Sequence, residues 1–127
     1  MSRWPMTVYL IGAVVFLIIV LVQVFLAGLV VVALQTDWSS HKTLGHYLAL
    51  PAIIMLIAAY AGRFPGKLKL WTWLLFGLFI LQAYILISLR AAVPVLSALH
   101  PVLALVEFAL GLVLIGQARA LDRSLPR

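Results

Sequence analysis

Four long apolar runs, separated by short polar segments, make up most of the chain. They cover about residues 9–34, 44–61, 70–89 and 97–117. An α-helix of about 20 residues crosses the roughly 30 Å hydrocarbon core of a bilayer. Because short connections join such helices as antiparallel neighbours, the pattern predicts an all-α fold. We expect a single transmembrane domain over residues 1–127, built as an integral membrane four-helix antiparallel bundle.

The segments beside and between these runs are expected to be ends and loops. Residues 1–8 are interpreted as a short head, residues 35–43 as a loop and residues 118–127 as a solvated tail. Pro51 lies inside the second run, where it lacks the backbone N–H that an α-helix needs, so we expect a kink there. The first run is longer than the apolar part of a signal peptide and is interpreted as a span.

Composition agrees with a membrane protein and limits the chemistry available to it. The chain is 66% hydrophobic and 9% charged, against roughly half and a quarter in soluble domains. It has no cysteine, which excludes disulfides, thiolate nucleophiles, cysteine-ligated iron–sulfur clusters and thioether-linked haem. Three histidines and three acids are few for an independent enzyme, so we expect a non-catalytic protein without a soluble substrate.

Lysine and arginine side chains flank the apolar runs, and their distribution predicts the orientation. One side of the predicted bundle carries Arg3, Arg63, Lys67, Lys69, Arg119, Arg123 and Arg127; the other carries only Lys42 and Arg90. Basic residues accumulate on the cytoplasmic side of membrane proteins. The pattern therefore predicts a multi-pass protein of the bacterial inner membrane with both termini in the cytoplasm. The positive charge is assigned to the lipid bilayer rather than to nucleic acid.

The two halves of the chain show the same spacing of polar residues. Gln23 in the first run is followed by His41, and Gln82 in the third run is followed by His100, at an identical separation along the chain. Each half thus consists of a helix that contains one glutamine, then a loop, then a second helix with a histidine near its start. Two such repeated hairpins would place the histidines at matching depth, as membrane bundles do when a site lies on a pseudo-twofold axis.

Small residues share a helix face with each of these histidines. The stripe with His41 holds Gly45, Leu48, Ala52 and Ala59, and the stripe with His100 holds Ala104, Glu107, Gly111 and Ala118. Such stripes allow close helix packing or leave room for a flat macrocycle. His46 lies about 140° around the helix from His41, toward bulkier residues. This favours His41 over His46 without excluding His46.

Glu107 is the one acid deep in a run, and it follows His100 by about two helical turns. A carboxyl in an apolar span is costly and marks a functional site by default. We expect either a hydrogen bond from Glu107 to Gln82 or a backbone carbonyl between helices, or a role as a proton relay or a cofactor's neighbour. Gln23 and Gln82 are interpreted as hydrogen-bonding residues between helices.

The segments QVFLAGLVV and HKTLGHYLAL together resemble one helical hairpin of the haem A synthase family. QAYILISL with ALHPVLALVEF is similar to the same hairpin. The chain therefore resembles one four-helix half of that family, and also small uncharacterised four-span bacterial membrane proteins with an ALHP-type fourth helix. In haem A synthase each four-helix half can hold a haem through two histidines at the outer end of the bundle.

The resemblance implies haem b as cofactor, with His41 and His100 as its axial ligands and His46 as the alternative to His41. Lys42 and Arg90 lie near these histidines and would pair with haem propionates, although snorkelling to lipid headgroups explains them equally well. Haem A synthase has eight spans and a glutamate close to a histidine, whereas Glu107 lies two turns from His100. The resemblance therefore does not imply haem oxidation.

Several functions remain open from the sequence. The leading hypothesis is bis-histidine haem b binding, for electron transfer or as an accessory subunit of a larger membrane redox complex. The alternatives are a cofactor-free structural subunit of a respiratory or photosynthetic complex, and a (bacterio)chlorophyll-binding subunit in which one histidine ligates magnesium. His100 could also be a helix N-terminal residue bonded to loop carbonyls, next to Pro101. Other membrane subunits, or further copies of this chain, are the expected partners.

Overall fold

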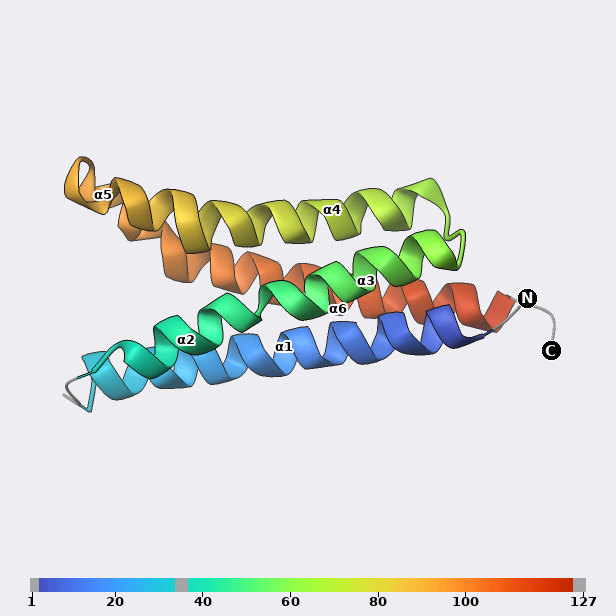
Figure 1. Ribbon diagram of the computed structural model, residues 1–127, viewed down its shortest axis with the longest axis horizontal. Helices are drawn as coiled ribbons and strands as arrows, with labels where there is room; N and C mark the ends of the chain where they lie inside the picture. The colour runs from blue at the N-terminus through green and yellow to red at the C-terminus, as the bar shows by residue number, and fades with distance from the viewer. Residues whose placement is uncertain (1–2, 34–36, 125–127) are drawn as a thin grey trace.

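The computed structural model describes residues 3–33 and 37–124, which contain helices and no strands. The first half holds α1 (Trp4–Val31), α2 (Ser39–Tyr47) and α3 (Ala49–Ala61) (Figure 1). The second half holds α4 (Gly66–Ile80), the π-helical turn η1 (Leu81–Leu86), the 3-10 turn η2 (Leu89–Ala91), α5 (Pro94–Ser97) and α6 (Leu99–Ser124). The all-α prediction is confirmed.

Four helical segments are long and apolar enough to cross a membrane. They are Trp4–Val31, Ser39–Ala61, Gly66–Leu86 and Pro94–Ser124. Each predicted run lies largely within one of these segments, but every segment begins before its run, by three to five residues. Hydropathy finds the part of a helix that suits lipid, whereas polar residues at the ends continue the same backbone hydrogen bonding.

Three expectations about the ends of the runs are corrected. The head expected over residues 1–8 is helical from Trp4, with Pro5 in the first turn, where its missing N–H costs nothing. The loop expected over residues 35–43 already becomes α2 at Ser39. The tail expected over residues 118–127 continues α6 as far as Ser124. Residues 1–2, 34–36 and 125–127 lie outside the described part of the chain.

A break separates α2 from α3 in the second segment. It lies at Leu48, whose N–H bonds to the carbonyl of Gly45 instead of that of Leu44. Pro51 follows three residues later, and its ring cannot donate to the carbonyl of Tyr47. The kink that Pro51 predicts therefore occurs on its N-terminal side. It lets α2 change direction relative to α3.

The four segments pack as a ring of antiparallel neighbours (Figure 1). The helix α1 packs against α3 and α6, and α4 packs against the same two helices. The helices α3 and α6 are therefore diagonal to each other across the bundle. The last turns of α1, the start of α2, η2 and α5 lie together at one end, which we call the histidine end. The first turn of α1, the last turn of α6 and the α3–α4 connection form the other, which we call the basic end.

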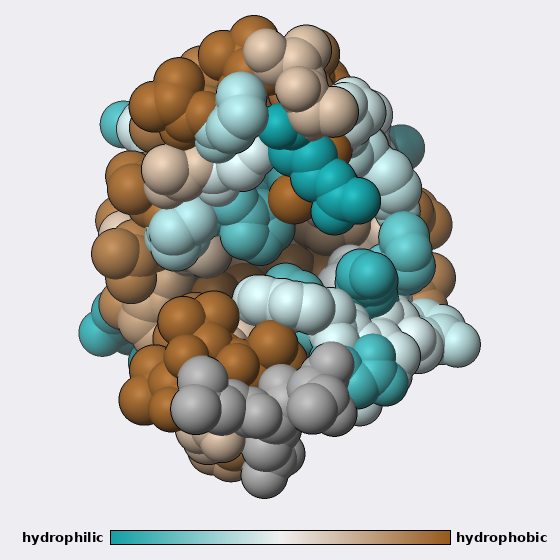
Figure 2. Space-filling model, turned by 90° about the vertical axis from the view of Figure 1, so that its left-hand side faces the viewer, coloured by the Kyte–Doolittle hydropathy of each residue, from teal (hydrophilic) through white to brown (hydrophobic). Residues whose placement is uncertain are grey.

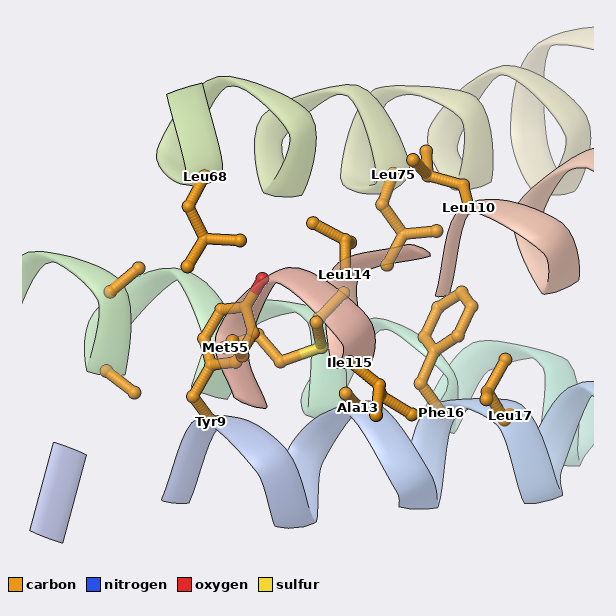
Figure 3. Close-up of a cluster of buried hydrophobic side chains, with 14 of the residues drawn as sticks. Tyr9, Ala13, Phe16, Leu17, Met55, Leu68, Leu75, Leu110, Leu114 and Ile115 are labelled. Carbon is orange, nitrogen blue, oxygen red and sulfur yellow. The ribbon is translucent and has the colours of Figure 1, made fainter. Parts of the chain in front are cut away.

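The interior between these helices is filled by side chains from all four segments (Figure 3). Tyr9 and Phe16 from α1, Met55 from α3 and Leu75 from α4 meet there, and all four are fully buried. Alanines and glycines on the same faces bring the backbones close together. At Gly12, for example, an added Cβ would lie 3.0 Å from the Met55 side chain. A polar contact between α1 and α4 lies in this core, where the hydroxyls of Tyr9 and Thr72 are 2.7 Å apart.

The two hairpins bury equivalent positions. His100 follows His41 by the same number of residues as Gln82 follows Gln23, and we call this number the repeat offset. The buried residues of α6 are Glu107, Leu110, Gly111, Leu114, Ile115 and Ala118. The same offset leads back to Leu48, Pro51, Ala52, Met55, Leu56 and Ala59, which are all buried as well. The second helical segment of each hairpin, α3 in the first and α6 in the second, therefore turns equivalent residues toward the bundle axis.

Candidate functional site

Two histidines face each other near the histidine end of the bundle. His41 lies on α2 and His100 on the first turn of α6, and both side chains are half-buried. Their ring centroids are 6.0 Å apart, with the ring planes at 66°. Because α2 continues into α3, which is diagonal to α6, the two rings meet across the bundle axis. The two histidines are distant along the chain, and the fold brings them together.

Each histidine is held by the glutamine of its own hairpin, His41 by Gln23 and His100 by Gln82. Nδ1 of His41 is 3.1 Å from the carbonyl oxygen of Gln23, and Nδ1 of His100 is 3.3 Å from that of Gln82. A carbonyl oxygen can only accept, so Nδ1 carries the proton in both rings. With the proton on Nδ1, Nε2 is the ring nitrogen whose lone pair can bind a metal. This is the arrangement by which metal-ligating histidines are oriented in proteins.

The side chains of the two glutamines have different partners. Gln23 donates from Nε2 to the backbone carbonyl of His41 at 2.9 Å, so Gln23 and His41 are joined twice. Gly45 makes this contact possible, since an added Cβ at Gly45 would lie 2.7 Å from Gln23 Nε2. The sequence indicated Gly45 only as part of a stripe of small residues. In the structure, the missing side chain of Gly45 leaves the space that the amide of Gln23 occupies.

In the second hairpin the glutamine side chain bonds to the buried acid instead. Gln82 donates from Nε2 to Oε2 of Glu107 at 2.9 Å, and Glu107 is fully buried. Gln82 lies in the π-helical turn η1, an irregularity that is frequent at functional sites. The equivalent part of α1, around Gln23, is ordinary α-helix. The hydrogen bond between Gln82 and Glu107 matches one of the two roles expected for this acid, and no pattern in the sequence predicts the π-helical turn.

Asp37 holds the first turn of α2, the helix that carries His41. Its carboxylate accepts hydrogen bonds from the N–H of Ser39 at 2.8 Å and from the Ser39 hydroxyl at 2.5 Å. These bonds hold the pKa of Asp37 below its usual value. A carboxyl whose pKa is lowered by folding stabilises the fold at neutral pH, and this contribution is lost as the pH falls through the lowered pKa. Asp37 was not among the residues expected at the site.

His46 does not take part in the histidine pair. It is exposed, its Nδ1 lies 3.2 Å from the hydroxyl of Tyr84 on η1, and the two rings are 5.8 Å apart. The structure therefore places His41, and not His46, opposite His100. The contact links the first hairpin to the second along one side of the bundle. Tyr84 has no distinguishing pattern in the sequence, so its pairing with His46 could not be anticipated.

Lys42 and Arg90 lie at the histidine end, on α2 and η2, and both are exposed. Figure 2 views this end and shows it hollowed in the middle, with hydrophilic residues around the hollow. Beside His41 there is also a cavity of about 80 Å³, lined by Leu26, Leu29, Val30, Asp37, Ser40 and His41. The helix α2 packs against α1 and α3, and His41 and His46 reach the second hairpin through His100 and Tyr84.

The donor set suits a metal that takes two nitrogens from the protein. Within residues 3–33 and 37–124, no group of three or more His, Asp or Glu side chains is arranged to hold a metal ion. A closed zinc site of three or four protein ligands is therefore not present in this part of the chain. Two imidazoles from diagonal helices would leave the other coordination positions to a ligand from outside the chain, as a porphyrin supplies.

Comparison with protein families places part of the chain in a known family. The model of a family described as a family of unknown function (DUF6220) matches residues 23–92, which is more than half of the chain. The matched segment runs from Gln23 through His41 and Gln82 to the η2 turn, and it ends before His100. No curated protein and no solved structure matches the chain.

Proposed function

The chain belongs to the DUF6220 family, and we propose that it is an integral membrane protein that binds haem b between His41 and His100. The observation that carries this proposal is the facing pair of imidazoles, with centroids 6.0 Å apart. Metal–imidazole bonds are about 2 Å long, so two rings that ligate one ion from opposite sides have centroids roughly 6 Å apart. The spacing thus suits bis-histidine ligation of a single iron.

The protonation of the two rings supports the same proposal. In both, the bond from Nδ1 to a glutamine carbonyl leaves Nε2 free to ligate. The hollow of Figure 2, between the hairpins at this end, is where we place the macrocycle. Lys42 and Arg90 at the rim would pair with its propionates. Haem supplies one-electron transfer when bound, and the chain's own part is to ligate it, orient the rings and shield it from water.

Hydropathy and charge favour a membrane setting with the histidine end outside. All four helical segments have the length and apolarity of membrane spans. The basic end holds Arg3, Arg63, Lys67, Lys69, Arg119 and Arg123. We therefore place that end in the cytoplasm of a bacterium and the histidine pair near the outer surface of its inner membrane. The equivalent buried positions of the two hairpins support an internal repeat around the site.

We infer a role in electron transfer, alone or as an accessory subunit of a larger membrane redox complex. The surface outside the bundle is largely aliphatic, with exposed side chains such as Ile11, Ile18 and Leu105. This surface suits lipid or the helices of another membrane subunit. The proposal also retains the resemblance to one half of haem A synthase, without its haem-oxidising activity.

The visible spectrum of the purified protein, oxidised and then reduced, tests the proposal. Paired α and β bands that sharpen on reduction are expected for bis-histidine haem b. A band typical of (bacterio)chlorophyll would show that the protein binds a magnesium pigment instead of haem. A protein purified from cells supplied with haem, and still without any visible band, would overturn the proposal and leave a cofactor-free structural subunit.

A further inference from the structure

Leu48 and Glu107 occupy equivalent positions of the two hairpins, seven residues after His41 and His100. Leu48 is 3% exposed and Glu107 is 0% exposed. The first hairpin therefore shows that this position requires only a buried apolar side chain. A carboxyl in the same environment costs free energy, so packing does not account for Glu107.

Several buried polar atoms on and around Glu107 have no hydrogen-bond partner, and apolar packing does not explain their presence. Gln82 is the one hydrogen-bond partner that the described residues give Glu107, through Oε2. Oε1 of Glu107 and Oε1 of Gln82, both buried, have none, and neither does Oγ of Ser97 at the histidine end. In the described part of the first hairpin, Oε1 of Gln23 is likewise buried without a partner. The first hairpin has Trp38 where the second has Ser97, and Leu48 where the second has Glu107.

The other titratable groups of the elements around Glu107 divide between the two ends of the bundle. Those of the histidine end are His41, Lys42, His46, Tyr47, Tyr84, Arg90 and His100, and those toward the basic end are Tyr9, Tyr60, Lys67, Lys69, Arg119, Asp122 and Arg123. Tyr9 is already bonded to Thr72, and Tyr84 to His46. Glu107 is thus the one carboxyl inside the described bundle, and the carbonyl of its partner Gln82 holds His100.

We propose that Glu107, together with Gln82, is a proton-binding site coupled to reduction of the metal centre between His41 and His100. Glu107 takes up one proton for each electron that the centre gains from a one-electron donor, such as a reduced haem protein. The proton comes from water at the histidine end and forms an O–H bond on the carboxylate. An added electron removes positive charge near Glu107, so the protonated form becomes more favourable. The inference rests on the proposed haem binding.

A redox titration of the purified holoprotein at a series of pH values tests the proposal. With full coupling, the midpoint potential of wild type falls by about 59 mV per pH unit, the one-electron equivalent of a tenfold change in proton concentration, over the range in which Glu107 titrates. Glu107→Gln keeps the size and an acceptor oxygen for Gln82 but cannot titrate, and its potential should be independent of pH. Glu107→Leu, which copies Leu48, should behave in the same way.

The matched control is His46→Gln, which removes a titratable group at the same end and should keep the wild-type slope. A flat wild-type profile overturns the proposal, as does an undiminished slope in a folded Glu107 variant or a slope lost in His46→Gln. In each of these cases the bis-histidine spectrum persists, so the haem proposal stands. A wild-type protein that binds no haem overturns both.

Discussion

The amide of Gln23 occupies the space that a side chain on Gly45 would need. An added Cβ at Gly45 would lie 2.7 Å from Nε2 of Gln23, the atom that donates to the carbonyl of His41. This pair ties α1 to α2 at the level of the candidate ligand. The position of His41 therefore depends on a residue that carries no chemistry of its own.

Gly45→Ala should displace Gln23 and loosen His41. Overpacking a close helix contact costs about 1–3 kcal/mol, and we expect lower thermal stability and partial loss of haem. Gly28→Ala on α1 is the control, because an added Cβ there meets nothing within 4 Å and alanine favours a helix. Thermal unfolding and haem content would be measured on both variants. Equal behaviour of the two would contradict this role of Gly45.

The histidine pair makes a sharper prediction. His41→Ala and His100→Ala should each abolish the bis-histidine spectrum, because either one removes an axial ligand. His46→Ala should keep it, since His46 faces Tyr84 on the exposed side. Absorption spectra of the oxidised and reduced proteins would be compared at equal protein concentration. Full haem retention in either of the first two variants would refute the ligand assignment.

The two cations at the histidine end are expected to contribute less than the ligands. Lys42→Ala and Arg90→Ala should weaken haem binding without changing its spectrum, because each removes one contact with a propionate and no bond to iron. Haem titration of the apoprotein would measure the change in affinity. Lys67→Ala, at the basic end, serves as the control. If all three variants bind alike, Lys42 and Arg90 act only at lipid headgroups.

Tyr9 and Thr72 allow a test of the buried polar contact in the core. Tyr9→Phe leaves Thr72 bonded to the Leu68 carbonyl at 2.8 Å, so the loss should be about 0.6 kcal/mol, the average for such bonds in membrane helices. Thr72→Val leaves the buried Tyr9 hydroxyl without this partner, which costs about 1–3 kcal/mol. Reversible unfolding in detergent would give both values. The reverse order would contradict the bonding described.

Orientation can be measured directly, because the chain has no cysteine of its own. Ser40→Cys places a thiol at the histidine end and Lys67→Cys one at the basic end, both at exposed positions. A membrane-impermeant maleimide should label the first in intact spheroplasts and the second only after permeabilisation. The opposite pattern would place the histidine pair on the cytoplasmic side.

The sequence alone identified the helical segments and the buried polar residues that the structure brings together at the candidate site, for physical reasons. Lipid requires long apolar helices, so hydropathy located all four segments, although not their polar ends at Trp4 or Ser39. Buried polar residues are rare in such helices, so Gln23, Gln82, Glu107 and the histidines were conspicuous. The identical spacing from glutamine to histidine predicted matching hairpins, in which each histidine does bond to its own glutamine.

Only the tertiary structure could choose between His41 and His46, because that choice depends on how α2 leaves the kink before Pro51 and lies against α1. It also showed that two similar hairpins differ at their centre: Gln23 bonds back to the histidine backbone, whereas Gln82 turns to Glu107. Sequence periodicity gives the face on which a residue lies. The partner that this face meets is determined by helix packing, and helix packing brings the rings of His41 and His100 opposite each other across the bundle.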